Sequence, residues 1–375
     1  TYKLVEDMIE EGMVASACSV GYGGIAEALF KMGLGNHIGF KMRADKTTHE
    51  MFQPMYGSIV LEMVSDSPAG EILGETTKEY VFEACGEKLD MAQLQEIWEG
   101  KLEPVYPYRK AGPTVEKING KLTAPAAPKI GVAKPKVIIP VFPGTNCEYD
   151  TAKAFARAGA DPEILVIRNL TPADVAESCK ALVKAIDNSQ IVMLPGGFSG
   201  GDEPDGSAKF IASFFRNPEV TEAVRRLLQQ RDGLMLGICN GFQALIKLGL
   251  VPYGDIRPIT AYDPTLTFNT IGRHQSMLVR TRIASTGSPW LSKCEVGEQF
   301  TVAISHGEGR FVAPQEVLDT LMKNGQIATQ YVDIEGDPTM DQRYNPNASL
   351  LAIEGITSPD GRVIGKIGHT ARSGE

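Results

Sequence analysis

The stretch GLMLGICNGFQ, residues 233–243, decides the fold of the second half of this 375-residue chain. An apolar segment of the kind that forms a buried parallel strand ends at Cys239, and residues compatible with a helix follow it. Gly237 and Gly241 lie two residues to either side of the cysteine. This is the layout of a nucleophile elbow, with a thiol in the place that serine takes in esterases. The sequence therefore predicts a sharp strand-to-helix turn that carries a reactive sulfur.

Cys239 has two interpretations, as a packing residue and as a nucleophile. Reduced cysteine is among the most buried residue types and usually only packs. A packing cysteine requires neither neighbouring glycine, however, whereas a nucleophile needs room for the crossing backbone and for its substrate. The start of the following helix also favours a thiolate, because its N–H groups and dipole stabilise negative charge. We therefore predict that Cys239 is a nucleophile.

The composition is typical of a globular enzyme. The chain is long enough for two or three domains, with 43% hydrophobic and 22% charged residues. Its net charge of −9 disfavours nucleic acids and anionic membranes as partners, because neither would meet a basic surface. No apolar run approaches the ~20 residues that span a bilayer, and the first residues do not resemble a signal peptide. We expect a cytoplasmic protein that binds neither nucleic acid nor membrane.

The cysteines show no C-x-x-C pair and no spacing typical of metal ligands, so we predict reduced thiols and no metal site. The chain opens on Thr1 as if within a domain and closes directly after a strand-like segment, so we expect a fragment of a longer polypeptide. The six cysteines are Cys18, Cys85, Cys147, Cys179, Cys239 and Cys294.

Three regions are predicted along the chain. Residues 1–110 mix helix-like and strand-like patterns, including an expected helix start at GYGG, residues 21–24. Residues 111–135 are rich in proline, alanine and lysine and predict an extended linker. Residues 136–375 begin with repeated strand–helix units, which favour a parallel sheet covered on both faces. Strands are expected at 136–142, 164–167, 190–194, 234–238, 275–283 and 300–305, and helices at 148–158, 173–186, 207–216 and 218–230.

Two further features could assist a thiol nucleophile. The glycine-rich segment PGGFSGGD, residues 195–202, follows a strand, so its backbone N–H groups near Gly197 and Phe198 could hold an oxyanion. The N–H of Asn240 would be a second donor. A base is also needed, and either His306 or His369 could supply it. From the residues alone His306 is the better candidate, because Glu308 lies two residues on and could orient its ring.

Residues 136–375 resemble the class I, or triad, glutamine amidotransferases. Within that class they are similar to the glutaminase domains of the phosphoribosylformylglycinamidine synthase family, in its large fused form. Residues 1–110 then resemble the tail of the synthetase domain, with an α+β fold. The resemblance rests on four stretches: FPGTNCE (142–148), PGGFSGGD (195–202), GICNGFQ (237–243) and SHGEGR (305–310).

The resemblance implies a flavodoxin-like open parallel sheet and a role for particular residues. Cys239 would attack glutamine, His369 would act as the base, and Gln243 would contact the bound glutamine. His306, with Glu308 two residues on, would support the site. The partners would be glutamine and the N-terminal synthetase region of the same enzyme. No cofactor is implied for this chain, whereas ATP and Mg²⁺ are implied for the full-length enzyme.

The chain departs from the family pattern at one catalytic position. Two residues after the catalytic histidine the family has an orienting glutamate, and here that residue is Ala371. Either another carboxylate substitutes, with Glu308, Glu354 and Glu375 as candidates, or activity is weakened or lost. Two rivals follow: another cysteine hydrolase on the same scaffold, such as a peptidase-like or chaperone-like relative, and a non-catalytic assembly module.

Overall fold

The computed structural model describes residues 2–65, 70–105, 111–120, 128, 131–200 and 207–372. The chain divides into two units, residues 1–107 and 108–375. In these described ranges, no helix combines the length and the apolar character that crossing a bilayer requires.

The first unit is an α+β arrangement. A pair of antiparallel strands, β1 and β3, packs with helix α2, and a second sheet runs in the order β4-β2-β5-β6. Helix α4 begins where the Asp90 side chain accepts the N–H groups of Ala92 and Gln93, a standard N-cap. The elements are α1 (Tyr2–Glu10), β1 (Val14–Ser19), α2 (Gly24–Leu34), β2 (Gly39–Met42), α3 (Thr48–Met51), β3 (Ile59–Met63), β4 (Gly74–Thr77), β5 (Val81–Ala84), β6 (Glu87–Asp90) and α4 (Met91–Gly100).

The described part of the predicted linker packs along the second unit. The N–H of Ile118 donates to Oε1 of Gln330 at 3.0 Å, and Nη1 of Arg282 donates to the Ile118 carbonyl at 2.7 Å. Arg282 is itself buried, and desolvation lowers its pKa from its usual value. Residues 111–120 are therefore part of the second unit rather than a spacer standing apart from it.

A mixed sheet forms the centre of the second unit. Among the described residues it has nine strands, in the order β13-β12-β15-β16-β17-β10-β9-β7-β8. The strands from β17 to β8 are parallel, and those from β16 to β13 add in antiparallel fashion. The strands are β7 (Lys136–Val141), β8 (Asp161–Val166), β9 (Ile191–Leu194), β10 (Leu234–Ile238), β12 (Gln275–Ile283), β13 (Gln299–His306), β15 (Ile327–Val332), β16 (Ile353–Thr357) and β17 (Val363–Lys366).

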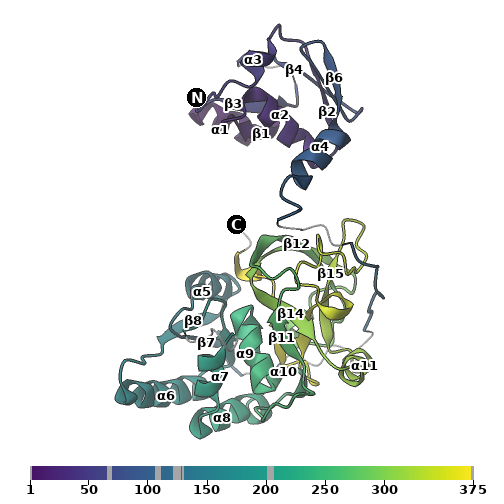
Figure 1. The fold of residues 1–375 in the computed structure, drawn as a ribbon. Coiled ribbons are helices and arrows are strands. Elements are labelled where there is room, and N and C mark those ends of the chain that lie inside the picture. The colour runs from purple at the N-terminus through teal and green to yellow at the C-terminus, as the bar shows by residue number, and fades with distance from the viewer. Residues whose placement is uncertain are drawn as a thin grey trace. The chain divides into compact units, whose positions relative to one another are not determined.

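Helices cover both faces of the parallel part (Figure 1). Alternate side chains of β7, β9 and β10, such as Ile139, Met193 and Ile238, form one apolar cluster with helix α5. The intervening residues, such as Ile138 and Val192, join the larger core beneath the helices on the other face. The helices are α5 (Glu148–Arg157) on the first face, and α6 (Pro172–Asp187), α7 (Lys209–Phe215), α8 (Pro218–Arg225) and α9 (Asn240–Leu248) on the second.

The predicted parallel sheet with helices on both faces is confirmed, and the β-rich region after residue 265 forms its antiparallel extension. The largest error in a strand boundary lies in β8. The strand predicted at 164–167 begins three residues earlier, and it includes Pro162. Proline is tolerated there because β8 is an edge strand, which needs no N–H donor on its open side. The remaining elements are α10 (Leu250–Tyr253), β11 (Thr265–Phe268), β14 (Glu308–Val312) and α11 (Gln315–Lys323).

The strand order places three loops at one edge of the sheet. The parallel strands follow the flavodoxin-like order. The first connection leads from β7 to its neighbour β8 on one side, and the later strands β9, β10 and β17 are added on the other side, so the strand order reverses between β7 and β9. Loops that leave the carboxyl ends of β7, β9 and β10 therefore meet at the position where such sheets bind ligands. These loops carry Cys147, Gly197 and Cys239.

Gly241→Ala tests the close packing of α9 on the sheet. A Cβ at Gly241 would overlap the carbonyl oxygen of Leu194 in β9, so we expect the substitution to lower the free energy of unfolding by about 3 kcal/mol. Gly307→Ala is the matched control, because a Cβ there would meet no atom within 4 Å. Urea unfolding of the two variants measures the difference, and equal stability would contradict this packing.

Candidate active site

Cys239 lies at the turn between β10 and α9 in a strained backbone conformation. Its φ is 52° and its ψ is −108°, a region that residues with a Cβ rarely adopt. Its N–H donates to the Lys366 carbonyl at 2.9 Å, which continues the pairing of β10 with β17 to the last residue before the turn. Its side chain is buried, with Sγ 3.9 Å from the Ser305 carbonyl oxygen. Strain of this kind is a sign of a functional turn.

The two glycines beside Cys239 are required by close approach. A Cβ at Gly237 would lie 2.6 Å from both the Gly241 carbonyl oxygen and a methyl group of Leu245. The first turn of α9 therefore crosses directly over the end of β10. The elbow predicted from the glycine spacing has its physical reason in this crossing.

His369 follows β17 and is fixed through its backbone. Its N–H donates to the Ala303 carbonyl at 2.8 Å, and the preceding N–H, of Gly368, donates to Oε1 of Glu354 at 2.6 Å. The ring is buried, and its Nδ1 lies 3.8 Å from the sulfur of Cys147.

Gly196 is the point around which the reactive side chains gather. A Cβ added there would lie 2.7 Å from Cε1 of His369, 3.3 Å from Sγ of Cys147 and 3.4 Å from Cβ of Cys239. Three residues from separate loops thus surround one glycine. The structure brings the predicted nucleophile and His369 to the same place, together with Cys147.

The glycine-rich loop is tied to the loop that follows β7. The N–H of Phe198 donates to the Gly144 carbonyl at 3.0 Å, and Thr145 forms an isolated antiparallel bridge with Gly197. The Phe198 N–H, one of the oxyanion donors expected from the sequence, is therefore bound within the protein. Gly197 has a φ of 146°, and a Cβ added there would lie only 2.6 Å from the Gly144 carbonyl oxygen. The last two residues of the predicted loop, 201–202, lie outside the described residues.

A chain of hydrogen bonds links this loop to α9 and β14. Oγ of Ser199 donates to Oδ1 of Asn240 at 3.0 Å, and Nδ2 of Asn240 donates to Oε1 of Gln243 at 3.1 Å. Nε2 of Gln243 then donates to the Glu308 carbonyl at 2.5 Å. All four residues are buried, so the network holds the first turn of α9 rigidly beside the glycine-rich loop.

His306 is buried in a state unsuited to a base at neutral pH. Within the described parts of the chain, neither of its ring nitrogens has a hydrogen-bond partner. Burial, followed by the nearby His274 and His369, lowers its pKa to about 3. The ring packs against Gly309, where a Cβ would lie 2.5 Å from its Cε1.

Glu308 does not orient His306, which corrects the expectation from their spacing. Its Oε2 accepts hydrogen bonds from the N–H of Ser207 at 3.0 Å and from the Ser207 hydroxyl at 2.7 Å. The two side chains separate because His306 ends β13 and Glu308 begins β14, which pairs with β11 instead. Glu308 therefore fixes the residues that lead into α7.

Glu354 supports the turn that carries His369. Its carboxylate is fully buried, and it accepts hydrogen bonds from the Gly368 N–H and from the Thr329 hydroxyl, with Nζ of Lys366 3.5 Å away. Glu375 lies outside the described residues. Ala371, at the position of the expected glutamate, lines a cavity of about 180 Å³ between α5 and the sheet.

Sequence reasoning missed Cys147 and Tyr331. Cys147 lies in the motif at 142–148, whose function the sequence did not identify. Tyr331 is fully buried on β15, and its hydroxyl accepts a hydrogen bond from Asn347 at 3.2 Å. Burial, then the nearby Glu354 and Cys239, raises its pKa well above the usual value, so the hydroxyl stays neutral. No sequence pattern indicated that this tyrosine lies near the site.

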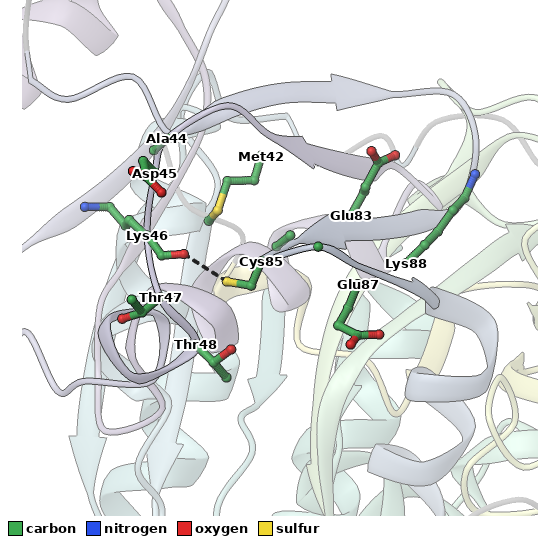
Figure 2. Close-up of a pocket in the computed structure, with 12 residues that line it drawn as sticks. Met42, Ala44, Asp45, Lys46, Thr47, Thr48, Glu83, Cys85, Glu87 and Lys88 are labelled. Carbon is green, nitrogen blue, oxygen red and sulfur yellow. Dashed lines mark hydrogen bonds between the residues drawn. The ribbon is translucent and has the colours of Figure 1, made fainter.

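A second hollow lies on the first unit and is unrelated to these residues. It has a volume of about 720 Å³ and lies between the segment after β2 and the β5–β6 hairpin. Figure 2 shows Cys85 at this hairpin, with its sulfur donating to the Lys46 carbonyl at 3.2 Å. In the ranges that the structure describes, no three His, Cys, Asp or Glu side chains are placed to hold a metal ion.

Comparisons with known proteins identify relatives of the second unit. Residues 134–375 match the model of the CobB/CobQ-like glutamine amidotransferase domain. A Chlorobium chlorochromatii protein named phosphoribosylformylglycinamidine synthase subunit PurQ is 34% identical over 236 residues, covering 63% of this chain and 87% of the relative. The Aquifex aeolicus protein of the same name is 33% identical over 242 residues, covering 64% and 92%. The solved structure of PurLQS from Thermotoga maritima is 25% identical, with a TM-score of 0.47, and covers 64% of this chain and 90% of that one.

This chain therefore belongs to the CobB/CobQ-like glutamine amidotransferase family. The Chlorobium chlorochromatii and Aquifex aeolicus relatives are both named as subunits of phosphoribosylformylglycinamidine synthase.

The low pKa of His306 predicts a pH dependence of stability. Between its ordinary value of 6.5 and about 3, the unfolded chain binds a proton at this ring and the folded chain does not, so stability falls as the pH drops below 6.5. From pH 7 to pH 5 this group should cost about 2 kcal/mol of unfolding free energy. His306→Asn should remove that part of the pH dependence in urea unfolding. An identical pH dependence in the parent and the variant would show that folding leaves the pKa of this ring unchanged.

Proposed function

We propose that this chain hydrolyses glutamine to glutamate and ammonia at Cys239, as the glutaminase of a phosphoribosylformylglycinamidine synthase. The observation that carries the proposal is the strained elbow at Cys239, whose Cβ lies against Gly196 together with the ring of His369. The family membership and the named function of the curated relatives support the same reaction.

In the first step Cys239 gives its thiol proton to His369, and its sulfur attacks the carboxamide carbon of glutamine. The C–N bond breaks, ammonia leaves with a proton supplied by His369, and a γ-glutamyl thioester remains on the cysteine. Water then attacks the thioester, giving up a proton to His369, and glutamate leaves with the thiol restored. A thiol suits this cycle because it needs less activation than a hydroxyl does.

We assign the base to His369 rather than to His306. A general base works best when its pKa lies near the working pH, and a pKa of about 3 leaves His306 too weak to take the proton of a thiol. His369 lies beside Cys239 across Gly196. His306, neutral and buried, is instead assigned to the wall of the site.

We assign the oxyanion to the N–H groups of Gly197 and Asn240. Asn240 opens α9, and the first N–H groups of a helix point along its axis toward a ligand. Gly197 lies in the loop that reaches the same edge of the sheet. Phe198, whose N–H is bound to Gly144, is left out of this assignment and its half-exposed ring is placed at the mouth of the site. Gln243, held beside Asn240, is proposed to contact the bound glutamine.

The ammonia is proposed to serve a synthetase region of the same enzyme. The relatives cover 63–64% of this chain, and the aligned family domain begins at residue 134. The first unit, up to residue 107, is proposed to be the tail of that region. ATP and Mg²⁺ are assigned to the step that consumes ammonia there, and not to the reaction at Cys239.

Cys239→Ser tests the nucleophile. We expect the parent chain to form glutamate from glutamine and the variant to lose roughly 10³-fold or more of kcat. Cys179→Ala is the matched control, because Cys179 is another buried cysteine and lies in helix α6. This variant should keep the parental rate. An electrophilic γ-glutamyl analogue should modify Cys239 in the parent. Equal turnover in the parent and Cys239→Ser would rule out this site.

Gly196→Ala tests the assembly of the site. The added Cβ would lie 2.7 Å from Cε1 of His369, so the ring must move away from Cys239. Because small displacements of catalytic groups are costly, we expect kcat to fall roughly 100-fold with little change in KM. The rate of glutamate formation measures the loss. A parental kcat would mean that His369 is not the base.

A further inference from the structure

We propose that Cys147 is the positioning residue for His369, taking the place of the glutamate that Ala371 replaces. The inference rests on the proposed glutaminase function and deepens it by naming the third member of the catalytic group. The juxtaposition that carries it is the buried contact between the sulfur of Cys147 and Nδ1 of His369, 3.8 Å apart, beside Gly196.

The hydrogen bonds of Cys147 define the direction of its proton. Its thiol donates to Oδ1 of Asn146 at 3.1 Å. The sulfur is then an acceptor toward the imidazole, so the proton of the neutral His369 ring is held on Nδ1. Nε2 becomes the basic nitrogen that exchanges protons with Cys239 and with the leaving ammonia. An orienting group acts mainly by fixing the tautomer and the ring position, and a thiol can do both.

Cys147 is itself held in place by the fold. It is the N-cap residue of α5, and its carbonyl accepts the Thr151 N–H at 3.0 Å. The neighbouring Thr145 bridges to Gly197 in the oxyanion loop. The contact is therefore fixed by the same loops that build the rest of the site.

The carboxylates that the sequence offered have other partners in the described structure. Glu308 binds Ser207, and Glu354 binds the N–H of Gly368 and the hydroxyl of Thr329. Glu354 thus fixes the backbone before His369, while Cys147 contacts the ring itself. The two effects, one on the backbone and one on the imidazole, together position the base.

Cys147→Ala tests the proposal in the full chain, with Ala371→Glu as the rescue. We expect Cys147→Ala to lower kcat for glutamate formation roughly 10- to 100-fold with little change in KM. Ala371→Glu on the Cys147→Ala background should restore most of the rate, because Ala371 borders a cavity with room for a longer side chain. Cys179→Ala is the control for losing a buried thiol, and Cys147→Ser keeps a smaller acceptor if the alanine variant does not fold.

The tautomer of His369 provides a readout that packing alone would not change. In ¹⁵N-histidine NMR spectra, the neutral ring of the parent should carry its proton on Nδ1, and Cys147→Ala should shift it toward a mixture of tautomers. This measurement needs no turnover, so it tests Cys147 even if the chain proves inactive. If the parent chain showed neither glutamine turnover nor labelling at Cys239, the glutaminase function would be overturned but the role of Cys147 would not. A parental rate in Cys147→Ala, or an unchanged tautomer, would overturn the role of Cys147.

Discussion

The turn at Cys239 is the constraint on which the rest of the second unit depends. A residue with a Cβ is held at a φ of 52° because β10 must end and α9 must begin within one residue. This is possible only because Gly237 and Gly241 let α9 cross the strand ends. A conformation of this kind costs about 1–3 kcal/mol, and it persists because the buried sheet and the network from Ser199 to Glu308 fix both sides of the turn.

Local patterns predicted the parallel half of the sheet well. Apolar, β-branched segments separated by amphipathic helices have little choice of structure, and the four strand–helix units from β7 to α9 follow those patterns. In the antiparallel half, β12 and β13 were predicted from their patterns, whereas β15 and β16 were not. Strands β15 and β16 are joined to the sheet by pairing over long separations, with Ile327 opposite Ile356, and no local periodicity encodes such partners. The start of β8 was missed because Pro162 reads as a break when its edge position is unknown.

The candidate site shows the same limit more sharply. Cys239 could be proposed from the sequence because its signal is local, in the glycines and the strand before it. The partner of Glu308 was mistaken because closeness in sequence to His306 suggested a contact that the change of strand prevents. The contact of Cys147 with His369 joins residues 222 positions apart, so only the folded chain reveals it. The sequence could show only that Ala371 replaces the expected glutamate and offer other carboxylates in its place. In the structure the side chain beside the ring of His369 is the thiol of Cys147.

The central claim is that Cys239 carries a covalent γ-glutamyl group during turnover. Rapid acid quenching of the chain with isotopically labelled glutamine, followed by peptide mass spectrometry, tests it most directly. The account predicts a γ-glutamyl thioester on the peptide that contains Cys239 and none on the peptide that contains Cys147. Turnover with no adduct on Cys239, or with the adduct on Cys147, would contradict it.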